Sequence, residues 1–108
     1  MVEVDESPSE AAAREAEEEL GRRFEVGELL VVAYSEGGRT PLDGVMFVFD
    51  GGVVDEPASA FELPADELSA AEFVTLDDLD RYLIPKMADR MRAAVSAAAS
   101  GQLVYLER

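Results

Sequence analysis

Three glutamates near the start of the chain are spaced to bind a cation. Glu15, Glu18 and Glu19 stand at positions i, i+3 and i+4, so in a helix their carboxylates share one sector of roughly 100°. Like charges at these spacings repel by about 0.2–0.5 kcal/mol per pair, which favours a neutralising partner. A hard divalent cation such as Mg²⁺ takes oxygen ligands of this kind. A solvated acidic helix face is the alternative interpretation of the same residues.

The helix that would position these carboxylates is marked at both ends. Ser7 suits the N-cap, Pro8 suits the first helical position, and Glu10 stands three residues after the serine, as in a capping box. Gly21 is a typical C-terminal stop. The sequence therefore predicts a helix between Pro8 and Gly21, preceded by a loop at residues 1–5.

The composition limits both fold and function. With 108 residues, of which 48% are hydrophobic, the chain predicts a single domain spanning residues 1–108. The lack of histidine and cysteine excludes histidine acid–base chemistry, thiol chemistry and thiolate zinc sites. A formal net charge of −15 argues against a general binder of nucleic acids or anionic membranes. Because no pattern of a signal peptide or membrane span is found, we expect a cytoplasmic protein.

The carboxylates belong to a longer pattern of fixed spacing. Glu6 is followed by seven residues and then by the string Arg14, Glu15, Ala16, Glu17, Glu18, Glu19, Leu20 and Gly21. This pattern resembles the Nudix box, G-x5-E-x7-R-E-U-x-E-E-x-G-U, in which U is a bulky aliphatic residue. Alanine at position 16 and arginine at position 22 depart from the aliphatic positions. The first glycine of the box would stand one position before Met1, so the resemblance implies an N-terminally shortened Nudix protein that begins inside the box.

The resemblance implies a role for each of these residues. Glu15, Glu18 and Glu19 would ligate the divalent ions, Mg²⁺ or Mn²⁺. Arg14 would orient a glutamate by charge-assisted hydrogen bonding, and Glu6 would assist the attacking water.

The acidic loop at residues 55–70 would contribute one further acid, as a metal ligand or general base. From its position before the next predicted strand we choose Glu67, with Glu62 in reserve. An ordinary solvated loop is the alternative interpretation.

The implied reaction is the metal-dependent hydrolysis of a diphosphate linkage in a nucleoside diphosphate derivative. Such a reaction needs charges placed around the diphosphate and requires no serine, cysteine or histidine nucleophile. Two alternatives stay open: an inactive shortened remnant or acidic binding module, and an acidic mimic of nucleic acid. The sequence does not choose among diphosphate substrates.

The rest of the chain predicts strands and C-terminal helices. Apolar runs at 29–34 and 45–49, joined by a turn rich in glycine, predict two antiparallel strands, the first buried on both faces. Further strands are predicted at 72–75 and 103–106, and Thr75 would cap a short helix that extends through Leu83. Pro85 predicts the start of a longer helix that ends at Gly101. Its predicted buried stripe contains Met87, Met91, Ala94, Val95 and Ala98.

These elements predict an α+β fold. The resemblance implies a Nudix-like α/β/α sandwich, in which a small mixed sheet lies between the acidic helix and the C-terminal helices and the N-terminal strands are missing. A sheet without those strands would expose an unpaired edge and apolar surface. We therefore expect a homodimer or a strand-swapped association. The expected ligand is a small nucleoside diphosphate derivative, with neither nucleic acid nor membrane as a partner.

Overall fold

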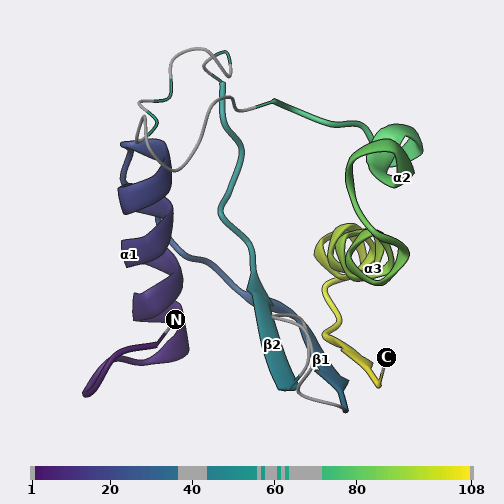
Figure 1. Cartoon of the computed structure of the whole chain (residues 1–108), viewed down its shortest axis with the longest axis horizontal. Coiled ribbons are helices and arrows are strands. Elements are labelled where there is room, and N and C mark those ends of the chain that lie inside the picture. Colours follow the sequence, from purple (N-terminus) through teal and green to yellow (C-terminus); the bar gives the residue numbers. More distant parts are fainter. Residues whose placement is uncertain are drawn as a thin grey trace. The chain divides into compact units, whose positions relative to one another are not determined.

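A computed structural model describes residues 2–36, 44–55, 57, 61, 63 and 72–107 (Figure 1). The elements in chain order are α1 (Pro8–Leu20), β1 (Leu29–Ser35), β2 (Gly44–Phe49), the 3-10 helix η2 (Leu76–Asp78), α2 (Leu79–Tyr82), α3 (Pro85–Ser100) and β3 (Val104–Leu106). Helices and a small mixed sheet confirm the predicted α+β fold.

The chain divides into two compact units. The first contains Met1–Gly27 and Gly51–Phe73, and the second contains Glu28–Asp50 and Val74–Arg108. The acidic helix belongs to the first unit, while the sheet and the C-terminal helices belong to the second. The single domain at residues 1–108 and the layering of the acidic helix on the sheet stay predictions.

The acidic helix α1 begins and ends where its capping residues predict. Ser7 Oγ accepts a hydrogen bond from the Glu10 amide at 3.2 Å, and Glu10 Oε1 accepts one from the Ser7 amide at 3.0 Å, which completes the capping box. At the other end Gly21 has a φ of 65°, a left-handed conformation that glycine adopts without steric cost. Its amide donates to the Glu17 carbonyl at 2.9 Å.

In the first unit the ring of Phe61 packs against the rings of both Phe24 and Phe73. The ring centroids of Phe24 and Phe61 lie 6.2 Å apart, as do those of Phe61 and Phe73. The guanidinium of Arg22 lies over the Phe24 ring at 5.4 Å from its centroid, which is a cation–π distance. These rings connect the segment after α1 with the segment that ends at Phe73.

In the second unit β1 lies at the centre of a three-stranded sheet with the order β2-β1-β3. β2 pairs with β1 in the antiparallel sense and β3 pairs with it in the parallel sense. The predicted antiparallel pair and the predicted final strand are therefore confirmed. The prediction that the first strand is buried on both faces is wrong in part, since Tyr34 of β1 is 38% exposed. The predicted strand at 72–75 is wrong, since these residues form no strand. Its aromatic residue, Phe73, packs on the Phe61 ring instead of joining a sheet.

The helix α3 packs on one face of β1 through small residues. Ala94 and Ala97 form a buried cluster with Val31 and Ala33 of β1 and with Leu30. Partly buried residues of the neighbouring strands complete this core: Met46, Val48, Val104 and Leu106. They lie opposite Val31 and Ala33 in the strand pairing, so they share the face that α3 covers.

The predicted buried stripe of α3 is wrong in part. Ala94 is buried as predicted, but Val95 is 48% exposed and Ala98 is exposed. Ala97 and Arg90 are buried instead. The helix therefore turns Ala94 and Ala97 toward the sheet, because small side chains let a helix approach a strand closely, and it leaves Val95 exposed.

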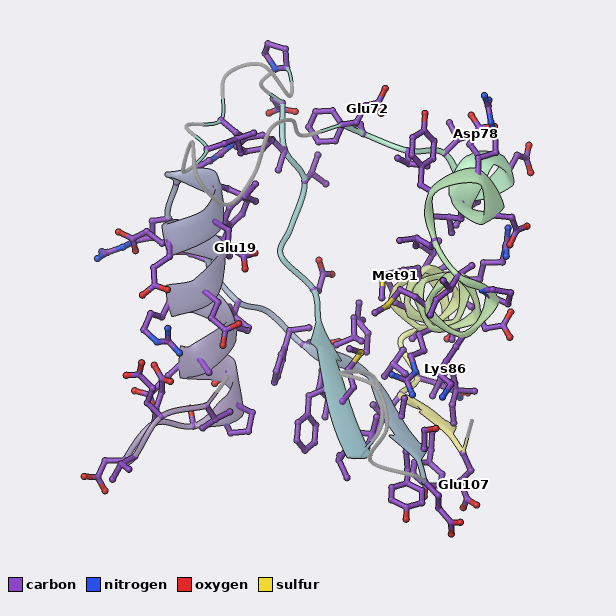
Figure 2. The ribbon with its side chains drawn as sticks, in the orientation of Figure 1. Glu19, Glu72, Asp78, Lys86, Met91 and Glu107 are labelled. Carbon is purple, nitrogen blue, oxygen red and sulfur yellow. The ribbon has the colours of Figure 1, made fainter. Side chains whose placement is uncertain are left out.

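Two basic residues of α3 reach the strands. Arg90 is fully buried, and its Nη1 lies 3.5 Å from the Met46 sulfur of β2. Lys86 donates from Nζ to Ser35 Oγ at the end of β1, at 2.7 Å (Figure 2). The burial of Arg90 was not predicted from the sequence, since arginines are mostly exposed.

The turn before α3 is fixed by one arginine. Arg92 binds the Asp80 carboxylate with two hydrogen bonds, at 3.2 and 2.9 Å, and its Nη2 donates to the Leu76 carbonyl at 3.1 Å. The predicted short helix is present as η2 and α2. However, Thr75 makes no side-chain capping bond.

In the part of the chain that the structure describes, no helix combines the length and apolar content needed to cross a membrane.

Candidate active site

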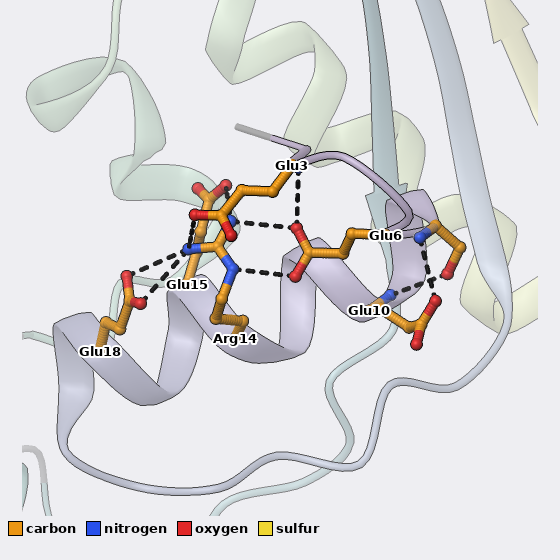
Figure 3. Close-up of polar contacts among 7 residues, drawn as sticks. Glu3, Glu6, Glu10, Arg14, Glu15 and Glu18 are labelled. Atoms are coloured by element: carbon orange, nitrogen blue, oxygen red, sulfur yellow. Dashed lines mark hydrogen bonds and ion pairs between the residues drawn. The ribbon is translucent and has the colours of Figure 1, made fainter.

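Arg14 is the centre of a group of four glutamates at the start of the first unit (Figure 3). Its guanidinium binds Glu6 with two hydrogen bonds, from Nε at 2.9 Å and from Nη2 at 3.2 Å. Nη1 donates to both carboxylate oxygens of Glu18, at 3.2 and 3.3 Å. Glu15 and Glu3 lie further away, at 3.5 and 3.8 Å. We call these five residues the Arg14 cluster.

A tight turn before α1 holds Glu6 against Arg14. The Glu3 amide donates to Glu6 Oε1 at 3.0 Å, while the Glu6 amide donates back to the Glu3 carbonyl at 3.1 Å. Asp5, inside the turn, has a φ of 64°, a conformation that aspartate tolerates better than most residues. The Glu6 carboxylate is thus held from two sides, by Arg14 and by the backbone.

The electrostatics of the cluster favour its charged form. The hydrogen bond from Arg14 and then the one from the Glu3 amide lower the pKa of Glu6 below its ordinary value. The bond to Glu6, followed by that to Glu18, raises the pKa of Arg14. Glu6 therefore stays a carboxylate, and Arg14 stays a cation, across the neutral pH range.

The three predicted metal ligands lie on one side of α1 but have different neighbours. Glu18 accepts from Arg14 through both oxygens, and Glu15 accepts through one. Glu19 is rotated about 140° around the helix axis from Arg14 and projects from α1 with an exposed side chain (Figure 2). Arg14 thus neutralises part of the negative charge of Glu15 and Glu18, a role that the sequence analysis gave to a metal ion.

The donor chemistry of this helix face fits a hard divalent cation. Carboxylate oxygens are the ligands that Mg²⁺ takes in proteins, and one or two of them are enough when waters and substrate phosphates fill the other positions. Among the described residues, no group of three acidic side chains is already gathered around one point for a metal ion. The helix therefore offers the ligands for such a partial coordination shell.

Glu67 and its reserve Glu62 lie outside the described residues, so their role stays a prediction. Sequence reasoning missed Glu3, which holds Glu6 through its amide and carbonyl groups. Main-chain contacts of this kind leave no signal in residue types.

Comparison with protein families identifies the family of this chain. A family model described as NUDIX domain matches residues 1–97, which include the Arg14 cluster, α1, the sheet strands β1 and β2, and most of α3. Comparisons with curated proteins and with solved structures find no match. The matched region covers most of the chain. The chain therefore belongs to the Nudix family.

Proposed function

We propose that this chain hydrolyses a diphosphate linkage in a nucleoside diphosphate derivative, using Mg²⁺ or Mn²⁺ held by α1. Family membership supports hydrolysis of the pyrophosphohydrolase type in general terms. The observation that carries the proposal is the Arg14 cluster, in which a guanidinium fixes carboxylates on and beside α1 at hydrogen-bond distances of 2.9–3.3 Å. A solvated acidic face would not require such an arrangement.

In this proposal Glu15, Glu18 and Glu19 would hold the divalent cation. The bound cation would neutralise the diphosphate and lower the pKa of the attacking water. Arg14 restrains the Glu18 carboxylate through both of its oxygens, which limits the rotamers that a flexible glutamate would otherwise sample. Glu19, exposed on the other side of the sector, would reach the cation from a different direction.

Glu6 would orient the attacking water and would not take up its proton. A general base works best when its pKa lies near the working pH, whereas the pKa of Glu6 is held below that of an ordinary glutamate. Its two hydrogen bonds from Arg14 leave it able to accept a further hydrogen bond in a fixed direction. Proton uptake is the role we propose for Glu67.

The proposal is tested by assaying phosphate-bond hydrolysis with a panel of nucleoside diphosphate sugars and dinucleotides, in millimolar Mg²⁺ and in EDTA. We expect Glu18→Gln and Glu19→Gln to lower kcat/KM by orders of magnitude. Glu17→Gln is the matched control, because it makes the same charge change on the same helix. Glu17 itself pairs with Arg23 and lies outside the Arg14 cluster. Equal activity of all three variants would refute the assignment of metal ligands.

Thermal unfolding with and without Mg²⁺ separates metal binding from hydrolysis. A cation that binds only the folded chain stabilises it by about 2.7 kcal/mol at a hundredfold excess over its dissociation constant. We expect this gain in the parent chain and its loss in the Glu18→Gln/Glu19→Gln double variant. Stabilisation by Mg²⁺ without hydrolysis of any panel member would instead identify a binding module.

A further inference from the structure

Among the described residues, the outer edge of β2 pairs with no strand. The sheet order β2-β1-β3 places β2 at one edge. Across the described residues, β2 is paired with β1 alone. A strand that is paired on one side presents unused backbone N–H and C=O groups on the other. Such an edge binds an extended strand by continuing the hydrogen-bond ladder.

The residues of β2 include none of the types that protect an edge strand. Its sequence, G-V-M-F-V-F, contains no charged residue and no proline, although charged residues make up 31% of the chain and the net charge is −15. Charged side chains and proline are what natural proteins use to prevent edge pairing. Because two acidic chains repel over most of their surfaces, an uncharged strand is where two copies can approach.

The sheet face away from α3 is apolar around the same edge. Val45 and Phe47 of β2 are 59% and 44% exposed, and Tyr34 and Tyr105 on the neighbouring strands are 38% and 59% exposed. Val45 lies opposite Tyr34, while Phe47 lies opposite Val32, which in turn lies opposite Tyr105, so these side chains share one face. Extending the sheet across the β2 edge would join two such faces into one continuous apolar surface.

We propose that the outer edge of β2 pairs antiparallel with the same edge of a second copy of this chain. The two three-stranded sheets then form one continuous sheet across a two-fold axis. Identical strands paired in this way make an isologous interface, which closes at two copies and does not propagate. This occupant matches an edge that is uncharged and complementary to itself.

The pairing register follows from the faces of β2. Opposite residues in an antiparallel pair point to the same face, so a symmetric register must be centred on a residue and not between two. Centred on Phe47, the register pairs this residue with its own copy, Val45 with Phe49, and Met46 with Val48. Centred on Met46, it would leave Phe49 unpaired and place Gly44 in the ladder. The Phe47 register therefore gives the larger number of apolar cross-strand pairs.

Single cysteine variants test this register, because the chain contains no cysteine of its own. Opposite residues of an antiparallel pair have Cα atoms about 4.5–5.5 Å apart, within the range that a disulfide bridges. Phe47→Cys should therefore form a covalent dimer under mild oxidation. Val45→Cys is the matched control: it lies on the same strand and is more exposed, yet the two copies of position 45 would be about 14 Å apart. A mixture of Val45→Cys and Phe49→Cys should cross-link between the two variants.

The solution mass tests the association itself. We expect the parent chain to sediment at twice the mass of one chain and Phe47→Lys to sediment as a monomer with unchanged helix content, since two like charges would meet at the two-fold axis. If Phe47→Lys does not fold, Val45→Lys, which places its charge opposite Phe49, should show the same loss of mass. A monomeric parent, or Val45→Cys cross-linking as readily as Phe47→Cys, would overturn the proposal.

Discussion

Replacing one alanine of α3 by leucine tests which face of this helix packs on the sheet. Ala97 is 2% exposed and lies in the cluster formed with Val31 and Ala33, which are fully buried. Three additional carbon atoms at this position would meet the β1 backbone or force the helix away from it. The next residue, Ala98, is exposed, so Ala98→Leu makes the same chemical change where space is available.

The expected size of the effect follows from the burial. Overpacking a close-packed core costs about 1–3 kcal/mol, whereas surface substitutions usually stay within about 0.5 kcal/mol. For a chain of 108 residues, the entropy of unfolding near 60 °C is about 0.2 kcal/mol/K. Ala97→Leu should therefore lower Tm by roughly 5–15 °C, and Ala98→Leu by no more than about 3 °C.

Circular dichroism of the two variants, followed through thermal unfolding, provides the measurement. Both variants should retain the helix content of the parent at low temperature, since leucine and alanine are both strong helix formers. A larger loss for Ala98→Leu than for Ala97→Leu would show that α3 packs through the stripe read from the sequence. Equal small effects would show that α3 does not pack closely on β1.

Three further substitutions probe the caps and the charge cluster. Ser7→Ala removes the oxygen that accepts from the third helical amide and should destabilise α1 by about 1 kcal/mol, visible as faster amide exchange in its first turn. Gly101→Ala forces alanine into a φ of 74° and should cost about 1–2 kcal/mol, whereas Gly51→Ala, without positive φ and with no atom near the added carbon, should be close to neutral. Because Arg14 lowers the pKa of Glu6 from its ordinary 4.5, the contribution of this carboxylate to stability is complete above that pH and is lost as pH falls through the lowered pKa. Glu6→Gln should therefore flatten the acid limb of stability against pH, measured by thermal unfolding at several pH values.

The elements with local signals were predictable from the sequence. Ser7, Glu10 and Gly21 set the bounds of α1, because capping depends on residues within one turn of the helix end. The β1–β2 pair was also predictable, since two apolar runs separated by turn residues have few other ways to pair. In both cases the deciding contacts are close in sequence.

The orientation of α3 could not be predicted, because periodicity gives weight to large apolar residues. Val95 has the stronger apolar signal, but Ala97 is the residue that fits under β1. Which stripe is buried depends on how near the helix can approach the strand, and this distance is a property of the packed pair. The burial of Arg90 could not be predicted for the same reason, since it depends on how the helix packs.

The positions of Arg14 and the glutamates on α1 were predictable from the sequence, but their hydrogen bonds were not. Helical spacing places Glu15, Glu18 and Glu19 on one sector, and the family pattern pairs Arg14 with a glutamate. The structure shows that Arg14 binds three, Glu15 and Glu18 on the helix and Glu6 in the preceding turn. The turn that brings Glu6 to Arg14 contains Asp5 in a left-handed conformation, and no spacing rule indicates that backbone angle.

The central strand of the sheet has one neighbour close in sequence and one far away, and this sets an order of assembly. β2 follows β1 after a short connection and can form a hairpin within about 1–10 μs, whereas pairing of β3 with β1 must close a much longer stretch of chain. With three residues, β3 also contributes the fewest ladder bonds. It is therefore the strand expected to join last and to detach first during local opening. Amides of Val104–Leu106 should exchange faster than those of β1 that face β2, and each such opening uncovers the second edge of the strand on which the whole unit is built.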